Sequence, residues 1–432
     1  MDDLTEAQIA RFRADVDRSR TPGAYEPGRW SVAPANRDSA VTGAMPERVR
    51  LRDTSMRAIE SLPGVVATPE EKLAFLRLLA RSGVPEIVLA TPIRSGHHGD
   101  GHPLDAVRAD LALVREEQPD CVVYCPFVSA TDGVDLARDL GFDGVQVAVA
   151  AFGPAAGIYR ASVPASREEV VAQAAEVAGH AHAQGLRVAV AFTMVSFLPD
   201  EALAETASIM AEAGADEITL FDGPGGVGPE AFGRLVHTTL KAAPDVEVGL
   251  HPHNTFGLGV ANAVSAARAG AVVVESSVNG YCGGPGNADL AATAAAFEAL
   301  YGVDTGIRLA ALTGLSRAGA VLTGRAPAAN QPITGRDAFC WGGGDWVIVE
   351  SEVDPLMHNS VEPALFGNER RIPLTPQSGP RATAAALRRL GVEADPALVP
   401  AIVERCHAEL ARLGRLLTDE EIRAVAHSVR TA

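Results

Sequence analysis

Short apolar runs recur along the chain from about residue 48, and amphipathic stretches separate them. The apolar runs are rich in β-branched residues, as expected of buried strands, and lie at residues 49–52, 86–90, 121–125, 144–149, 188–192, 217–221, 246–250 and 272–275. Between them, apolar residues follow helical spacing, for example at 69–82, 167–184, 200–213 and 257–269. Eight strands alternating with helices predict an α/β protein with a (β/α)8 TIM barrel.

The pattern differs on either side of this region. Residues 1–46 begin with a helical pattern and continue into a segment with no clear period, so we expect an N-terminal arm. The barrel is expected over 47–303, and a mainly helical C-terminal domain over 304–432. Three helices are expected there, at 381–390, 396–413 and 419–429. Thr418 and Glu421 have the spacing of a capping box at the start of the last one.

Composition and charge narrow the classes of partner. The formal net charge of -17 argues against nucleic-acid binding, because phosphate contacts need clustered Lys and Arg. No apolar stretch reaches the roughly 20 residues that span a bilayer, so no membrane partner is expected. The five cysteines are scattered and no secretory leader precedes them, which predicts free thiols and a cytoplasmic protein. Cys121 and Cys125 have metal-ligand spacing but flank a strand run, so we interpret them as core.

A pair of histidines at the end of the seventh expected strand predicts a metal site. His251 and His253 are two residues apart, and side chains at that spacing on a strand point the same way. Pro252 between them cannot donate to a sheet ladder, which places the pair at the carboxyl end of the strand. In a barrel of this kind, that end is the active face.

Other candidate ligands are expected on the same face. Asp53 closes the first strand, and Asn287 ends the glycine-rich stretch after the eighth. A carboxylate and two imidazoles leave open positions on a divalent cation, and mixed oxygen and nitrogen ligands suit Mg, Mn, Zn or Co. Taken alone, each motif is equally typical of a surface ion pair or a core histidine. Their joint placement at strand ends is what indicates a metal site.

Three motifs resemble a known superfamily. Leu51-Arg-Asp53, His251-Pro-His-Asn254 and the stretch 279–287 are similar to those of metal-dependent aldolase, lyase and synthase barrels. This superfamily includes isopropylmalate synthase, homocitrate synthase, hydroxymethylglutaryl-CoA lyase and 4-hydroxy-2-oxovalerate aldolase. The resemblance implies that Asp53, His251, His253 and Asn287 bind the metal. It also implies that Arg52 stabilises an enolate oxygen and that the protein is a homodimer.

The C-terminal region also resembles the isopropylmalate and homocitrate synthases, at residues 330–335, 337–339 and 378–379. Departures from the family pattern indicate an atypical substrate. Residues 54–57 replace the usual Gly-Glu-Gln or Gly-Met-His, and residues 341–346 replace a run that contains histidines in the synthases.

Residues 54–57 lack the histidine that serves as the base in the aldolases, so another residue has to replace it. His97, His98 and His102 follow the second strand and have a side-chain pKa suited to proton transfer, although a polar surface loop is an equal alternative. Cys282 is a further catalytic candidate. Tyr281 is a candidate substrate contact together with Arg52 and Asn287, with lid packing as the alternative for the tyrosine.

The sequence therefore predicts a divalent-metal-dependent enzyme, an acyltransferase that condenses an acyl-CoA with a 2-oxo acid. The alternative is a metal-dependent aldolase or lyase that cleaves a 4-hydroxy-2-oxo acid. It is favoured by residues 283–286, which lack the Glu-Arg usual in synthases, and by the aldolase-like run at 193–198. A non-catalytic barrel relative is a third reading, disfavoured because the charged cluster is intact.

Overall fold

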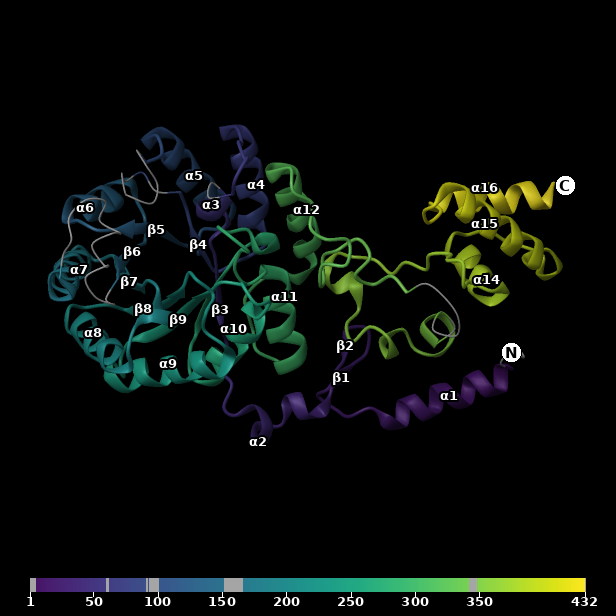
Figure 1. Cartoon of the computed structure of the whole chain (residues 1–432), viewed down its shortest axis with the longest axis horizontal. Helices are drawn as coiled ribbons and strands as arrows, with labels where there is room; N and C mark the ends of the chain where they lie inside the picture. The colour runs from purple at the N-terminus through teal and green to yellow at the C-terminus, as the bar shows by residue number, and fades with distance from the viewer. Residues whose placement is uncertain are drawn as a thin grey trace. The chain divides into compact units, whose positions relative to one another are not determined.

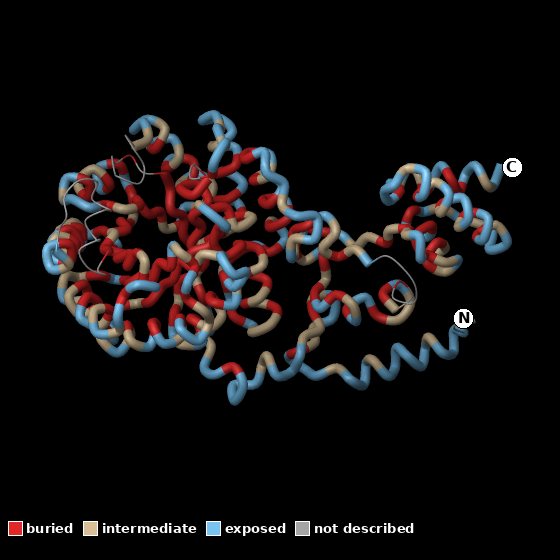
Figure 2. Tube along the Cα trace, viewed as in Figure 1, coloured by how far each residue is buried: buried red, intermediate tan, exposed pale blue. Residues whose placement is uncertain are grey.

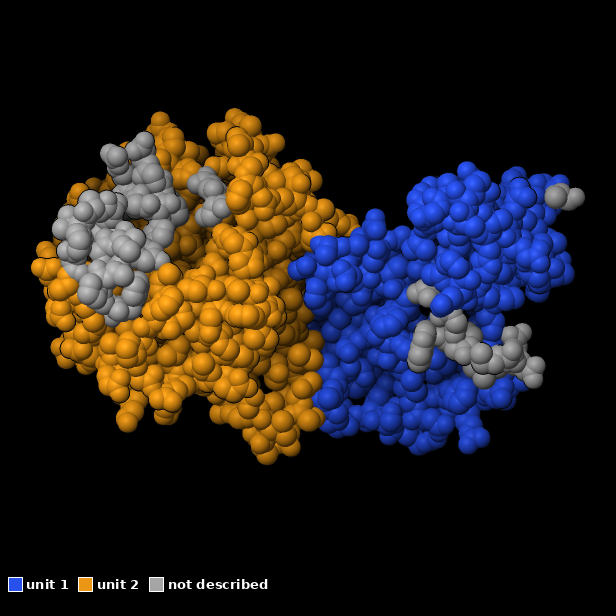
Figure 3. Space-filling model, viewed as in Figure 1, with its two compact units in different colours: residues 1–34, 328–432 blue, residues 35–327 orange. Residues whose placement is uncertain are grey.

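The computed structural model describes residues 5–59, 62–90, 92, 101–150, 166–341, 347 and 349–431. The chain divides into two compact units, drawn in different colours in Figure 3. One unit is continuous and spans residues 35–327; we call it the barrel unit. The second unit combines residues 1–34 with residues 328–432.

Eight parallel strands close into a barrel in the barrel unit (Figure 1). In chain order they are β3 (Arg50–Asp53), β4 (Glu86–Val88), β5 (Val122–Val128), β6 (Gly144–Val149), β7 (Arg187–Phe192), β8 (Glu217–Asp222), β9 (Glu247–Pro252) and β10 (Val273–Ser276). Each strand pairs with the next, and β10 closes the ring by pairing Val273 with Arg50 and Ser276 with Asp53. The expected (β/α)8 barrel is confirmed.

Helices lie between the strands and surround them (Figure 1). Those of the barrel unit are α2 (Ser39–Thr42), α3 (Ser55–Ala58), α4 (Pro69–Arg81), α5 (Leu104–Glu117), α6 (Thr131–Leu140), α7 (Arg167–Ala183), α8 (Asp200–Glu212), α9 (Pro229–Ala242), α10 (Gly259–Arg268), α11 (Leu290–Ala295) and α12 (Leu312–Thr323). Capping boxes begin α4 at Thr68 and α7 at Ser166, and so satisfy backbone N–H groups of the first turn. Figure 2 shows burial concentrated on the strands and on one side of these helices, where the core lies.

Strand β5 contains an irregularity that matters for the site. Its pairing with β6 shifts register between Cys125 and Val128. Phe127, inside this shift, has a φ of 53°, in the left-handed region that a bulky side chain rarely adopts. An interruption of strand register of this kind bends the strand and turns a side chain in a new direction.

The second unit has two parts far apart in sequence. Helix α1 (Glu6–Ser19) has no buried residue and begins with a capping box at Thr5. The short strands β1 (Tyr25–Glu26) and β2 (Trp30–Ser31) follow, and Trp30 forms a β-bridge with Val361. Backbone bonds from Ser31 N to Ser360 O (2.8 Å) and from Glu362 N to Arg29 O (2.7 Å) flank this bridge.

Three helices gather in the C-terminal part of the second unit: α14 (Pro380–Arg389), α15 (Val399–Leu413) and α16 (Asp419–Arg430). Their shared apolar core includes Leu387, Ile402 and Ile422. Thr418 and Glu421 form the expected capping box at the start of α16. Among the helices that the structure describes, none has the length and apolar character needed to cross a membrane.

Candidate active site

His251 lies at the carboxyl end of β9, inside the barrel mouth. Only 1% of the residue is exposed, and its ring stacks on Phe221 of β8 with centroids 4.3 Å apart. Its Nδ1 lies 2.8 Å from Oε2 of Glu275 on β10. An imidazole held at Nδ1 by a carboxylate has its tautomer fixed, which leaves Nε2 as the nitrogen for a metal or a substrate.

The glycine-rich stretch after β10 folds back onto the end of β9. Asn254 N donates to Gly286 O (2.9 Å), and Ala288 N donates to the carbonyl of Pro252 (3.2 Å). Gly286 has a φ of 85°, and a Cβ atom there would lie 1.9 Å from the carbonyl oxygen of Gly280. Only glycine fits this close approach, so the local sequence dictates how tightly the loop closes.

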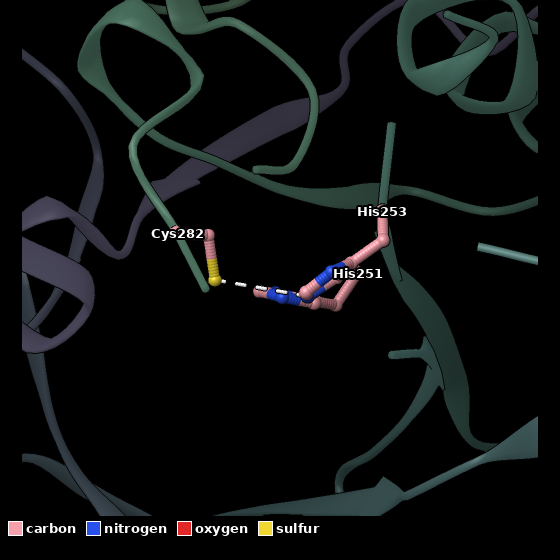
Figure 4. A group of neighbouring side chains, drawn as sticks. All are labelled: His251, His253 and Cys282. Atoms are coloured by element: carbon pink, nitrogen blue, oxygen red, sulfur yellow. Dashed lines mark hydrogen bonds between the residues drawn. The ribbon is translucent and has the colours of Figure 1, made fainter. Parts of the chain in front are cut away.

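Loop closure brings Cys282 against the two histidines (Figure 4). Its Sγ lies 3.7 Å from Nε2 of His253. One ligand atom from each of Cys282, His251 and His253 lies within 4.8 Å of the others. These three side chains, which we call the His-His-Cys cluster, come from β9 and from the loop after β10.

Electrostatics favour the ionised form of Cys282. Burial alone raises the pKa of a thiol, but hydrogen bonds with His251 and His253, together with the charges of His251 and Arg57, lower the pKa of Cys282 to about 5. Burial has the opposite effect on an imidazole and lowers the pKa of His251. The hydrogen bonds of His251 with Cys282 and Glu275 outweigh burial, so the pKa of His251 is raised overall. The cluster therefore presents a thiolate at neutral pH.

The donor set of the cluster fits a divalent cation. Nδ1 of His253 is buried and has no hydrogen-bond partner, so the contact of Nε2 with Cys282 leaves this second ring nitrogen unused. Two imidazoles and a thiolate are the ligands that zinc and cobalt accept, and a thiolate disfavours magnesium. The sequence alone indicates Cys282 only as a catalytic candidate, because its approach to the histidines depends on loop closure.

Asp53 and Asn287, the other expected ligands, have their own partners. Asp53 is fully buried, and its two oxygens accept from the backbone N–H (2.8 Å) and the hydroxyl (2.9 Å) of Ser55. Burial raises its pKa to about 7 against the effect of these bonds. Asn287 accepts from the hydroxyl of Ser277 and donates to Thr54 Oγ1 (3.3 Å). Neither belongs to the His-His-Cys cluster, and metal binding by them stays a prediction.

Arg52 lies inside the barrel among glutamates. Its Nε donates to Glu86 (2.7 Å), its Nη1 donates to Glu217 (2.9 Å), and Glu275 lies 3.4 Å from Nη1. Its guanidinium also lies over the ring of Tyr124, 4.1 Å from the centroid. Burial opposes its charge, yet the surrounding glutamates hold the pKa of Arg52 well above its usual value. Contact between Arg52 and an enolate oxygen stays a prediction.

The remaining candidates differ in what surrounds them. The hydroxyl of Tyr281 donates to the carbonyl of Arg325 (2.7 Å) and accepts from Asn279 (3.0 Å), so it fastens the glycine-rich loop. His102 is half-buried just before α5. His97 and His98 lie outside the described residues.

Comparison with known proteins identifies the family. The family model described as HMGL-like matches residues 48–318, which cover the barrel and continue into α12. The chain belongs to this family. The superfamily expected from the motifs at Asp53, His251 and Asn287 is therefore confirmed.

Several relatives of the chain are synthases by name. The chain is 33% identical over 372 residues to 2-phosphonomethylmalate synthase of Streptomyces rubellomurinus, covering 86% of this chain and 96% of that protein. It is 31% identical over 385 residues to homocitrate synthase AksA of Methanopyrus kandleri, covering 89% and 93%. The HMG-CoA lyase of Bacillus subtilis has the same fold, with a TM-score of 0.59 at 19% identity over 66% of this chain and 97% of that one.

Proposed function

We propose that this protein is a divalent-cation-dependent carbon–carbon synthase that condenses an acyl-CoA with a 2-oxo acid. The observation that carries the proposal is the His-His-Cys cluster at the carboxyl end of β9, with His251 oriented by Glu275. Relatives that are synthases by name, and that the chain covers almost in full, support the same reaction class.

The chain's own residues divide the work in this proposal. His251, His253 and Cys282 hold the cation, and Glu275 keeps Nδ1 of His251 engaged so that Nε2 remains free for it. When bound, the cation polarises the keto group of a 2-oxo acid and makes its carbon electrophilic. In the condensation, the α-carbon of the acyl-CoA loses a proton and forms a bond to that keto carbon, while the C=O π bond breaks and the keto oxygen takes up a proton to become a hydroxyl. Water then hydrolyses the thioester and frees CoA as a thiol.

Thiol release tests this proposal. The metal-free protein is reloaded separately with Mg, Mn, Zn or Co and given acetyl-CoA with a panel of 2-oxo acids. We expect thiol release that requires both the cation and the oxo acid, and a loss of at least about 100-fold in His253→Ala, because a ligand is removed. His237→Ala, at an exposed position on α9, is the matched control and should keep full activity.

The same experiment separates the synthase from a lyase. If no combination of acyl-CoA and 2-oxo acid releases thiol, but a 4-hydroxy-2-oxo acid is cleaved to pyruvate, the protein is a lyase and the proposal is wrong. Cation-dependent stabilisation without turnover of either substrate class would instead favour a non-catalytic relative.

The side chain of the 2-oxo acid is a separate question. The relatives' names include products that carry an apolar group, as in 2-isopropylmalate, and an anionic one, as in 2-phosphonomethylmalate. The reaction class alone therefore does not tell whether the side chain of the 2-oxo acid is apolar or anionic.

A further inference from the structure

Arg57 is a buried arginine that has no hydrogen-bond partner among the described residues. It lies in α3, directly after β3, and therefore at the same end of the barrel as the His-His-Cys cluster. Only 8% of the residue is exposed. Its Nε and Nη2 atoms are buried, and neither makes a hydrogen bond. In the sequence, Arg57 stands out only as part of the run 54–57, which departs from the family pattern.

Aromatic rings hold the guanidinium of Arg57 in place. Its Cζ lies 4.8 Å from the ring centroid of Phe127 and 5.9 Å from that of Phe221. Phe127 is the residue with positive φ in the β5 irregularity, so the strained backbone and the arginine contact occur together. Phe221 also stacks on His251. Arg57 and His251 thus both contact one aromatic ring.

Among the described residues, one carboxylate, that of Glu275, lies within 4 Å of Arg57, and it does not satisfy the arginine. Oε2 of Glu275 lies 3.8 Å from Nη2, beyond hydrogen-bond distance, and the same oxygen lies 2.8 Å from Nδ1 of His251. The other oxygen of Glu275 accepts from Gln146 and faces Arg52. Glu275 is therefore already shared among other donors, and the N–H groups of Arg57 remain available.

A buried guanidinium with unused N–H groups is unfavourable in the free protein. A ligand that brings an anion to it would satisfy these donors. The planar fork of arginine matches a carboxylate or phosphonate, which accepts two parallel hydrogen bonds. Such an anion would belong to the substrate, because Arg57 lies beside the cluster: Oε2 of Glu275 is within 4 Å of both Arg57 Nη2 (3.8 Å) and His251 Nδ1 (2.8 Å).

We propose that Arg57 binds a second anionic group, a carboxylate or phosphonate, on the side chain of the 2-oxo acid. The inference rests on the proposed synthase function and specifies its substrate class. All 2-oxo acids share a carboxylate and a keto oxygen, and in the proposed function these two groups bind the cation. A substrate with no other anionic group therefore has nothing to pair with Arg57. Arg57 is accordingly a specificity-determining residue.

Steady-state kinetics with two substrate classes test this proposal. Pyruvate and 2-oxoisovalerate represent apolar side chains; oxaloacetate, 2-oxoglutarate and phosphonopyruvate represent anionic ones. The wild-type protein should prefer at least one anionic substrate. Arg57→Met should raise KM for that substrate about 10- to 100-fold, the effect of losing a hydrogen-bonded charge, with little change for the apolar class. Arg57→Lys, which keeps the charge without the fork, should recover part of the loss.

A binding measurement without turnover separates failure of this inference from failure of the proposed function. Phosphonopyruvate should raise the Tm of the cation-loaded wild-type protein, and raise it less in Arg57→Met. Arg81→Met, an exposed arginine on α4, is the control for the substitution itself. If no oxo acid releases thiol but this difference in Tm persists, the anion site stands while the synthase reading fails.

Two results would overturn the role of Arg57. One is an equal change in KM for apolar and anionic substrates, which would make the arginine a packing residue between Phe127 and Phe221. The other is a wild-type protein that prefers an apolar oxo acid. Circular dichroism of both variants shows whether they fold, and Arg57→Lys keeps the test decisive if Arg57→Met does not.

Discussion

Two arginines near the end of β3 show opposite uses of a buried charge. Arg52 is completely buried and donates to Glu86 and Glu217, with Glu275 close by. Arg57 is almost as buried and makes no hydrogen bond among the described residues. The contrast separates a charge that holds the barrel together from one that is prepared for a ligand. In a buried site, an unmet donor indicates binding more directly than the residue type does.

The largest expected effect comes from removing the paired arginine. Arg52→Met should lower the free energy of unfolding of the barrel by about 3–5 kcal/mol, because it leaves several glutamates buried without their common cation. Arg57→Met should leave the stability unchanged or raise it, because it removes a buried donor that has no partner. Calorimetric unfolding of the two variants measures the difference. Similar losses of stability in both variants would contradict the different roles of Arg52 and Arg57.

Cys121 and Cys282 extend the comparison to two buried thiols, for which we expect an effect of intermediate size. Burial raises the pKa of Cys121 to about 12, whereas the two histidines lower that of Cys282 to about 5. The thiolate of Cys282 therefore forms as pH rises through about 5, so iodoacetamide should modify it at neutral pH in the metal-free protein and leave Cys121 untouched. Peptide mass spectrometry follows both sites.

Zinc or cobalt should protect Cys282 from alkylation, because a bound thiolate is no longer a free nucleophile. Cobalt should also produce a sulfur-to-cobalt charge-transfer absorption that Cys282→Ser lacks while His237→Ala retains it. Modification that begins only near pH 9, or cobalt spectra identical in Cys282→Ser, would exclude the thiolate from the cluster.

The smallest effect belongs to an exposed ion pair in the second unit. The bond from Arg415, followed by that from the backbone of Thr418, lowers the pKa of Glu421 to about 2. Because the folded-state pKa lies below the unfolded one, the stabilisation is complete above about pH 4.5 and is lost as pH falls toward 2. Glu421→Gln should give a slightly lower Tm at pH 7, and the difference should vanish at low pH.

This pH dependence has an internal control. Glutamine can still accept from the Thr418 N–H, so Glu421→Ala should cost more than Glu421→Gln. A difference in Tm between wild type and Glu421→Gln that stays constant from pH 7 to pH 3 would contradict the assignment to the ionised carboxylate.

The positions of the barrel strands could be predicted from the sequence, because both faces of each strand are buried and the strand is therefore a continuous apolar run. The expected run at 144–149 matches β6 residue for residue. β5 continues past its expected end at Cys125, because the register shift accommodates Pro126 within the strand. β9 extends to Pro252, whose carbonyl still accepts a bond from Ala288 although the proline has no N–H.

The candidate site was less predictable because it depends on contacts between elements. The spacing of His251 and His253 predicts a metal site only together with Asp53 and Asn287 at neighbouring strand ends. Cys282 approaches the histidines only because the loop closes at Gly286. Phe127 contacts Arg57 from within the irregularity of β5. A local sequence pattern reveals neither feature. Glu275 left a usable signal that was missed: an acidic residue inside an apolar strand that should be buried.

The β-bridge between Trp30 and Val361 has a consequence for biosynthesis. Residues 29–31 are translated long before residues 360–362, to which their backbone is bonded, and the whole barrel is made in between. The barrel unit is continuous and can fold as it leaves the ribosome, whereas the arm must wait for its partner. Premature termination between residues 328 and 360 would therefore yield a complete barrel whose arm has no backbone partner.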